Sequence, residues 1–147
     1  MRGMSGLSID ELTEVVIGCA MAVHRALGLG LLESVYRDCL VIELQANGLA
    51  VEVEKFVSIT YRDQRVRSEL RIDILVDARL VVEVKAVERL HPVHQAQVIT
   101  YLKLSGCPAG LLFNFNALNI RGGLKRVDRP DVYAQKRAQR LGIRRPE

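Results

Sequence analysis

Three charged side chains, Asp73, Glu83 and Lys85, stand inside two apolar segments that flank a short polar turn. Apolar segments joined by a three-residue turn predict a β-hairpin, and pairing centred on Ala78 places Asp73 directly opposite Glu83. Because side chains alternate between the two faces of a strand, Lys85 shares a face with Glu83. Directly opposed residues have Cβ atoms about 4.5–5.5 Å apart, so two carboxylates and an ammonium group should converge on one face of a sheet.

Two opposed carboxylates repel each other unless a cation or a proton lies between them. An oxygen-rich site with two carboxylates suits Mg²⁺ or Mn²⁺, so the hairpin predicts a site for a divalent metal ion. The alternative is that these charges are solvent-exposed, as most charged side chains are. Apolar neighbours on both faces argue against it, because they indicate strands covered on both sides: Ile72, Ile74, Val76, Val82 and Val84. A slip of one residue in register would separate the acids.

The rest of the chain predicts a mixed α/β domain that supports this hairpin. Ser8 and Glu11 form a capping-box pattern before apolar residues at helical spacing, and Gly28-Leu29-Gly30 ends this first helix. We expect a helix over residues 31–47, strands over 51–61, 66–76 and 80–87, a helix over 92–104, a strand over 109–115 and a weaker strand over 120–127. The order α-α-β-β-β-α-β-(β) indicates a mixed β-sheet flanked by helices.

Length and composition predict one soluble domain. The chain has 147 residues, of which 49% are hydrophobic and 26% charged, as is usual for a globular protein. It has no apolar stretch long enough to span a bilayer and no signal-peptide pattern at its start, so we expect a cytoplasmic protein without a membrane partner. Cys19, Cys39 and Cys107 lack a paired spacing and are expected to be reduced, packed side chains.

Positive charge is concentrated at the C-terminal end. Nine Lys or Arg residues and three Asp or Glu residues follow residue 120, which gives that segment +6 and leaves −2 for the remainder. We therefore divide the chain into a single domain over residues 1–127 and a basic tail over residues 128–147. The tail can contact phosphate groups, or it can be a solubilising end.

Three residues of the helix that follows the hairpin are candidates to join the site. His94, Gln97 and Tyr101 lie at positions i, i+3 and i+7, which places them on one face above the strand ends. Gln97 and Tyr101 are suited to position a phosphate group or a water molecule. The alternative places Tyr101 in the core, with Gln97 and His94 on the helix surface.

Glu33 and Tyr36 are i, i+3 neighbours at the start of the second helix, just after the glycine break. A carboxylate in the first helical turn also complements the helix dipole, so stabilisation of the helix start is a strong alternative for Glu33. Glu33 and Arg37 have the i, i+4 spacing of an ordinary surface ion pair.

Taken together, these residues resemble the signature of the PD-(D/E)xK nuclease superfamily. Asp73 followed by Glu83-Val84-Lys85 is similar to its D…(D/E)xK motif, and residues 97–101 are similar to the QxxxY motif of its RecB-like branch. Residues 30–36 resemble the motif that names the GxxExxY family of this superfamily. Ile72 stands where many members have a proline. The resemblance covers about residues 12–127 and implies a restriction-endonuclease-like core with a mixed β-sheet flanked by helices.

The resemblance also implies a role for each matched residue. It implies a metal site formed by Asp73, Glu83 and the Val84 carbonyl, with Glu33 reaching the ion, often through water. The implied catalytic residues are Lys85, which orients the attacking water or stabilises charge on the phosphate, together with Glu33, Gln97 and Tyr101. The further candidates for substrate contact are Tyr36, His94 and Arg71.

The function expected from the sequence is hydrolysis of phosphodiester bonds in nucleic acid by a Mg²⁺- or Mn²⁺-dependent nuclease. We expect DNA ahead of RNA as the substrate. The sequence leaves open whether the chain forms a homodimer. The alternative is a nuclease-fold module that binds nucleic acid or assembles with partners but no longer turns over substrate. Every recognisable catalytic position is intact, which favours the enzyme.

Overall fold

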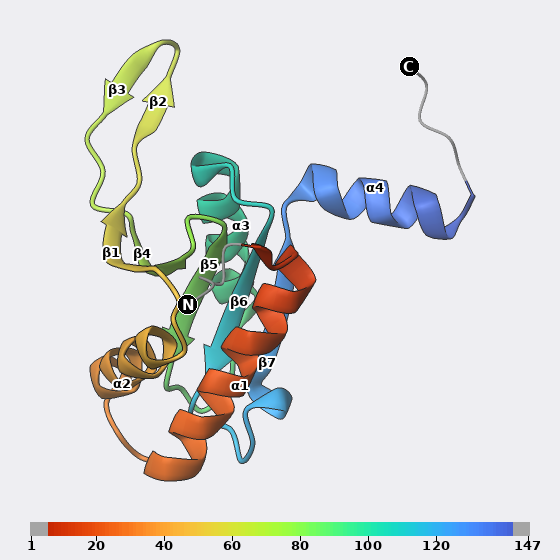
Figure 1. Cartoon of the computed structure of the whole chain (residues 1–147). Coiled ribbons are helices and arrows are strands. Elements are labelled where there is room, and N and C mark those ends of the chain that lie inside the picture. Colours follow the sequence, from red (N-terminus) through yellow and green to blue (C-terminus); the bar gives the residue numbers. More distant parts are fainter. Residues whose placement is uncertain (1–5, 143–147) are drawn as a thin grey trace.

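Four helices and seven strands make up the part of the chain that the structure, a computed structural model, describes, which is residues 6–142 (Figure 1). The elements are, in chain order, α1 (Ile9–Leu27), α2 (Glu33–Ala46), β1 (Val51–Phe56), β2 (Ile59–Tyr61), β3 (Gln64–Val66), β4 (Arg71–Val76), β5 (Leu80–Lys85), α3 (Pro92–Ser105), β6 (Ala109–Asn114), the 3₁₀ turn η2 (Arg121–Gly123), β7 (Leu124–Asp128) and α4 (Pro130–Arg140). None of the helices of this described part is both long and apolar enough to cross a membrane.

Local signals set the ends of the first two helices. The Ser8 hydroxyl accepts a hydrogen bond from the Glu11 amide at 3.1 Å, and the Glu11 carboxylate accepts one from the Ser8 amide at 3.0 Å, so the predicted capping box is present. Gly28 and Gly30 have φ angles of 70° and 92°, which side chains with a Cβ rarely adopt. This stretch ends α1 and lets α2 turn back along the sheet.

Five of the strands form one mixed sheet in the order β1-β4-β5-β6-β7. All neighbours are antiparallel except β5 and β6, which are parallel and connected through α3. The pairs Ile74↔Val82 and Val76↔Leu80 show that the β4–β5 hairpin is centred on Ala78, as predicted. The hairpin loop itself has left-handed Asp77 and Ala78, with φ near 55°.

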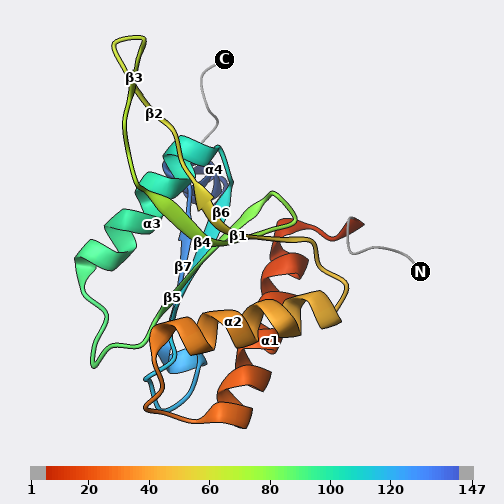
Figure 2. The same ribbon diagram turned by 90° about the vertical axis from the view of Figure 1, so that its left-hand side faces the viewer.

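Helices cover both faces of this sheet (Figure 2). The core on the α1 and α2 side includes Ile74, Val82 and Phe113, whereas the core on the α3 side includes Leu75, Val81 and Leu112. Consecutive strand residues thus fill opposite cores, as alternation requires. The predicted fold class, a mixed α/β domain with a sheet flanked by helices, is confirmed.

Several element bounds differ from the sequence-based expectation. The long strands expected over 51–61 and 66–76 each break, and β2 and β3 form a separate two-stranded ribbon. Val57, whose amide donates to the Leu70 carbonyl at 2.9 Å, is the last buried residue before this ribbon. Among the described residues, no helix or further strand covers β2 and β3 beyond Val57, and the two strands leave the sheet as a ribbon (Figure 1). The expected last strand begins as η2, and residues 130–140 of the basic tail are helical.

Candidate active site

The site lies where β4 and β5 part. Their backbone pairing ends at Ile74↔Val82, and the next contacts use side chains instead. The Asp73 amide donates to Glu83 Oε1 at 3.0 Å, and the Val84 amide donates to Asp73 Oδ2 at 3.0 Å. Each carboxylate therefore accepts a hydrogen bond from the opposite strand, and the two acids are held close together in the gap between the strands.

A change in the orientation of β4 at Asp73 creates this gap. Ile72 lies in the core under α3, whereas Ile74, two residues later, lies in the core under α1 and α2. Strict alternation would put both on one face, so the strand rotates between them. Opposite Asp73, by the register of β1 with β4, stands Glu54, whose φ of 51° is rare for a residue with a side chain. Asp73 consequently points toward β5 rather than toward either core.

Glu83 is the most deeply buried charged residue of the site. Its exposure is 2%, and burial, followed by the negative charge of Asp73, raises its pKa to about 8. Such a shift reports an unfavourable charge that a proton or a cation would relieve. The geometry therefore creates the electrostatic need for a positive group between the two carboxylates.

The donors at this point fit a hard divalent cation. A strand residue directs its N–H and C=O to the same side, so the Val84 carbonyl faces β4 as its amide does. Two carboxylate groups and one carbonyl, completed by water, suit the way Mg²⁺ is bound in proteins. Within residues 6–142 no group of three or more His, Cys, Asp or Glu side chains gathers as a metal site, so Glu33 is not a direct third carboxylate in this arrangement.

Lys85 lies next to the acids and is held by the start of α2. Its Nζ is 4.0 Å from Glu33 Oε1, and its side chain is 19% exposed. Glu33 is the first residue of α2, so helix-start stabilisation and pairing with Lys85 occur together. The structure thus brings Glu33 to the edge of the site through Lys85.

Gln97 and Tyr101 complete the α3 side of the site. Gln97 Nε2 donates to the Tyr101 hydroxyl at 3.1 Å, and both residues line a pocket of about 240 Å³ together with Asp73 and Arg71. Burial, and then the charges of Glu83 and Asp73, raise the pKa of Tyr101 to about 12. The tyrosine is therefore neutral and close to both acids.

His94 lies on the Lys85 side of the site. Its Nδ1 accepts a hydrogen bond from the His91 amide at 3.1 Å, which closes the first turn of α3. Burial lowers the pKa of His94, and the positive charge of Lys85 lowers it further, so both disfavour the charged form of the ring. Its second ring nitrogen is not used by the contact with His91.

The structure corrects the prediction that Tyr36 contacts substrate. Tyr36 is fully buried, its hydroxyl donates to the Gly28 carbonyl at 2.6 Å, and it accepts from the Leu31 amide at 3.2 Å. Its ring stacks on Phe115 with 4.9 Å between the centroids. The side chain fastens the glycine-rich turn to the core and leaves no surface for a substrate, because α1 and α2 close over it.

Two residues outside the predicted site, Glu54 and Arg37, also line the pocket. Glu54 Oε1 is 3.2 Å from an Arg37 nitrogen, and Glu54 Oε2 is 3.7 Å from an Arg71 nitrogen. Arg37 therefore pairs with Glu54 rather than with Glu33, the partner that its i, i+4 spacing suggested. No sequence signal marks Glu54, because its left-handed backbone is invisible in the residue pattern.

Asn114 is a third residue that the sequence analysis missed. It is the last residue of β6, where it pairs with Lys85 of β5, and is 4% exposed. Its side chain accepts from the Val87 amide at 3.0 Å and donates to the Val87 carbonyl at 2.8 Å. These bonds end β5 at Lys85 and fix the chain that leads into α3. The sequence signal that could have identified Asn114 is a polar residue at the end of an apolar strand.

Comparison with known proteins agrees with this geometry. A family model of the PD-(D/E)XK nuclease superfamily matches residues 10–127. The chain therefore belongs to the PD-(D/E)XK nuclease superfamily, whose members are typically nucleases that use divalent metal ions. Nucleic acid is accordingly the implied substrate. Neither the curated proteins nor the solved structures gave a significant match to the chain.

Proposed function

We propose that this protein is a Mg²⁺- or Mn²⁺-dependent nuclease of the GxxExxY family, in the RecB-like branch, and that it cleaves DNA in preference to RNA. The observation that carries the proposal is the pair of carboxylates, Asp73 and Glu83, held against each other where β4 and β5 part. A buried Glu83 and a half-buried Asp73 at a break in a sheet are costly for stability, because apolar side chains would pair these strands more stably.

In this proposal Asp73, Glu83 and the Val84 carbonyl hold the ion. A divalent ion held there would supply two effects, a lower pKa for a bound water molecule and neutralisation of negative charge on the phosphate oxygens. The hydrogen bonds from the Asp73 and Val84 amides orient the two carboxylates before any ion or substrate arrives. Preorganisation of this kind removes a reorganisation cost from the reaction.

Lys85 acts on the reacting groups themselves. An ammonium group has no lone pair to offer a cation, so its role must be directed at the water or at the phosphate. Pairing with Glu33 at 4.0 Å and the ordered end of β5 hold the lysine at the edge of the site. Glu33 keeps a second role in the proposal, contact with the ion through water.

The remaining candidates surround the pocket. Gln97 and Tyr101, joined by their hydrogen bond, position the water or a phosphate oxygen from the α3 side. In this proposal Arg71, which lines the same pocket, and His94 contact the substrate. The proposal also includes residence in the cytoplasm, which fits three free cysteines, and it leaves room for a homodimer.

Cleavage of a substrate panel tests the proposal. The full chain should cut one or more of single-stranded, duplex, nicked or branched DNA with Mg²⁺ or Mn²⁺ and not with EDTA. Lys85→Ala should lower cleavage by about 10²–10³-fold or more. Lys103→Ala, which removes an exposed lysine of α3, is the matched control and should cut as the wild type does.

A thermal shift with Mn²⁺ separates loss of chemistry from loss of the metal site. A ligand that binds only the folded state raises its melting temperature, so both the wild type and Lys85→Ala should be stabilised by Mn²⁺. Wild-type protein that neither binds Mn²⁺ nor cuts any substrate would show the alternative, a nuclease-fold module for binding or assembly. Retained metal-dependent cleavage by Lys85→Ala would remove Lys85 from the mechanism.

A further inference from the structure

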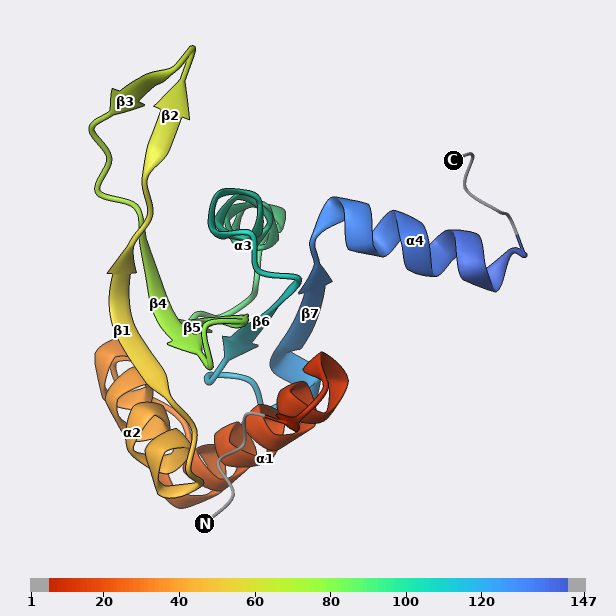
Figure 3. The same cartoon turned by 45° about the horizontal axis from the view of Figure 1, so that its top comes forward.

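The ribbon formed by β2 and β3 has no part in the site described above. It projects beyond the five-stranded sheet, and Figures 1 and 3 show it on the opposite side of α3 from α4. An isolated two-stranded ribbon is marginally stable in water. Apart from the half-buried Ile59, every residue of the two strands is exposed, so the ribbon contributes almost nothing to the core. A projection of this kind calls for an external partner.

The register divides the ribbon into two chemically different faces. Ile59 pairs with Val66 and Tyr61 with Gln64 on one face, while Thr60 pairs with Arg65 on the other. The Arg65 guanidinium also donates to the Ser58 hydroxyl at 3.4 Å. One face is therefore largely apolar, and the other presents a guanidinium with hydroxyl groups, which are common donors to phosphate oxygens.

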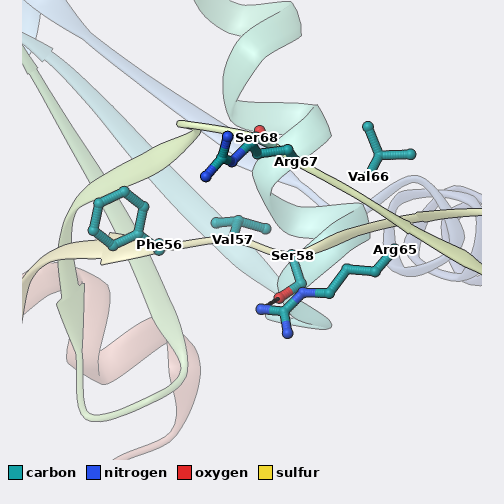
Figure 4. A pocket seen from close by; sticks show the side chains of 7 residues that line it. All are labelled: Phe56, Val57, Ser58, Arg65, Val66, Arg67 and Ser68. Atoms are coloured by element: carbon teal, nitrogen blue, oxygen red, sulfur yellow. Dashed lines mark hydrogen bonds between the residues drawn. The ribbon is translucent and has the colours of Figure 1, made fainter.

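A hollow lies at the base of the ribbon and is lined by residues of both faces. It has a volume of about 400 Å³, and Figure 4 shows the seven side chains that line it: Phe56, Val57, Ser58, Arg65, Val66, Arg67 and Ser68. Two arginines and two serines thus share one concave surface with three apolar side chains. Guanidinium groups recognise phosphate with two parallel hydrogen bonds, which gives such a hollow geometric selectivity for phosphate.

The charges of the ribbon are unbalanced. Residues 57–68 contain three arginines and a single acid, Asp63. In the described part of the chain, neither Arg65 nor Arg67 lies within ion-pair distance of a carboxylate, whereas Arg71 at the base pairs with Glu54 at 3.7 Å. Exposed cations without an internal partner favour an anionic ligand outside the molecule.

The ribbon is continuous with the candidate active site. The hollow ends at Ser68, and the pocket that contains Asp73 begins at Glu69, Leu70 and Arg71. A polyanion seated in the hollow would therefore lie beside the pocket that contains Asp73. Continuity with the site makes the nuclease's own substrate the fitting occupant.

We infer that the β2–β3 ribbon and the hollow at its base bind a B-form DNA duplex beside the scissile phosphate. The inference rests on the proposed function and names its substrate class. A two-stranded β-ribbon fits the major groove of B-DNA, which is about 12 Å wide. The major groove of an RNA duplex is too narrow for side chains to read, so DNA is favoured over double-stranded RNA.

Single-stranded nucleic acid fits this surface less well. Proteins that bind single strands stack the bases on aromatic side chains. Phe56 is the only ring that lines the hollow, and the Arg71 guanidinium lies 5.7 Å from its centroid, so one side of the ring is covered. Tyr61 lies on the opposite, apolar face of the ribbon.

Binding measured without divalent ions tests the inference separately from cleavage. Fluorescence anisotropy in EDTA would compare the full chain with Arg65→Gln/Arg67→Gln on a 30-base-pair DNA duplex, its single strands and an RNA duplex of the same sequence. The double variant should weaken duplex DNA binding at least about tenfold and flatten the salt dependence by about two units of slope. The wild type should prefer duplex DNA to both other ligands.

Two further variants control for charge and folding. Arg25→Gln/Arg121→Gln removes the same charge from α1 and η2 and should leave the affinity within about twofold of the wild type. Arg65→Lys/Arg67→Lys keeps the charge, so it should retain the salt dependence while losing part of the affinity. Melting curves for all variants establish that they are folded.

The possible failures are distinguishable. Duplex binding that depends on the ribbon, without cleavage under any metal condition, would uphold the ribbon and overturn the nuclease. If the wild type cleaves DNA and Arg65→Gln/Arg67→Gln binds the duplex as tightly as the wild type does, only the inference about the ribbon is overturned. Tighter binding of single strands or of RNA, or a change in oligomeric state in this variant, would also overturn it.

Discussion

The two faces of the sheet are built from the same strands but differ in their chemistry. On the α1 and α2 side the buried residues are almost all apolar, and Tyr36 uses its hydroxyl only to hold a turn. On the α3 side Glu83 and Tyr101 are buried beside apolar neighbours, and a pocket opens next to them. One helix covers this second face where two cover the first, so polar groups retain access to solvent and substrate.

The comparison teaches where this fold can keep costly groups. Alternation along β5 sends Val82 and Val84 into the closed face and Glu83 and Lys85 toward α3. A buried carboxylate on the closed face would lack both a cation and water. On the α3 face, the parting of β4 from β5 leaves room for a cation and for water. For this reason we place the proposed chemistry there.

Glu83→Gln, on the α3 side of the sheet, is the substitution that we expect to have the largest effect. The change removes a proposed metal ligand and should abolish cleavage. It should also alter the pH dependence of stability without metal. Since the folded-state pKa of Glu83 is raised from 4.5 to about 8, the wild type should lose stability as pH rises between these values, whereas Glu83→Gln should lose less.

Thermal melts in EDTA at pH 5.5 and pH 8.5 measure this difference. Every other titrating group is common to both proteins, so the difference between their two pH profiles reports on Glu83 alone. Added Mn²⁺ should restore wild-type stability at the higher pH and leave Glu83→Gln nearly unchanged. Parallel melting profiles for the two proteins across pH would show that Glu83 is not strained by burial.

Substitution of one tyrosine on each face should give opposite results. Tyr36→Phe removes two hydrogen bonds in the closed face and should lower the free energy of unfolding by about 1–2 kcal/mol, with the cleavage rate per folded molecule unchanged. Tyr101→Phe should hardly change stability and should slow cleavage about tenfold, because Gln97 loses the partner that positions it. Denaturant titration and single-turnover cleavage measure both. A slower Tyr36→Phe enzyme would return Tyr36 to the site.

Glu33→Gln should have a smaller effect at the border between the faces. Loss of its charge leaves Lys85 without its carboxylate partner, so cleavage should fall several-fold and Mn²⁺ affinity should weaken. Glu14→Gln, on the exposed side of α1, is the matched control. Unchanged affinity and cleavage in Glu33→Gln would leave Glu33 as a helix-start residue.

Removal of the chain after Pro130 should have the smallest effect. No residue of α4 is buried, so the melting temperature should stay nearly constant. If Arg137 and Arg140 contact phosphate groups, each lost contact reduces the salt slope of DNA binding by roughly one unit while cleavage persists. An unchanged slope would make the tail a solubilising end or an oligomer contact.

The sequence predicted the elements whose signals are local. The capping box of α1, the proline start of α3 and the hairpin centred on Ala78 each depend on a few adjacent residues and an apolar alternation. From that register the pairing of Asp73 with Glu83 followed directly. The structure adds that carboxylates, rather than backbone carbonyls, make the final contacts between the two strands.

Features that depend on distant neighbours were not predictable. The residue alternation continues through the point at which the hairpin leaves the sheet, so the separate ribbon had no sequence signal. Tyr36 matched a motif position, but its burial depends on Phe115, far along the chain. Glu54 entered the pocket because of a left-handed backbone within a strand, which no residue pattern reveals.

The reciprocal bonds between the acids and the opposite strand have a consequence for spectroscopy. The amide protons of Asp73 and Val84 are bonded to carboxylates, whereas those of regular sheet positions are bonded to carbonyls. An ion that draws on the same oxygen atoms competes with these two amides. Their NMR chemical shifts and hydrogen-exchange rates therefore report occupancy of the site directly, with no substrate present.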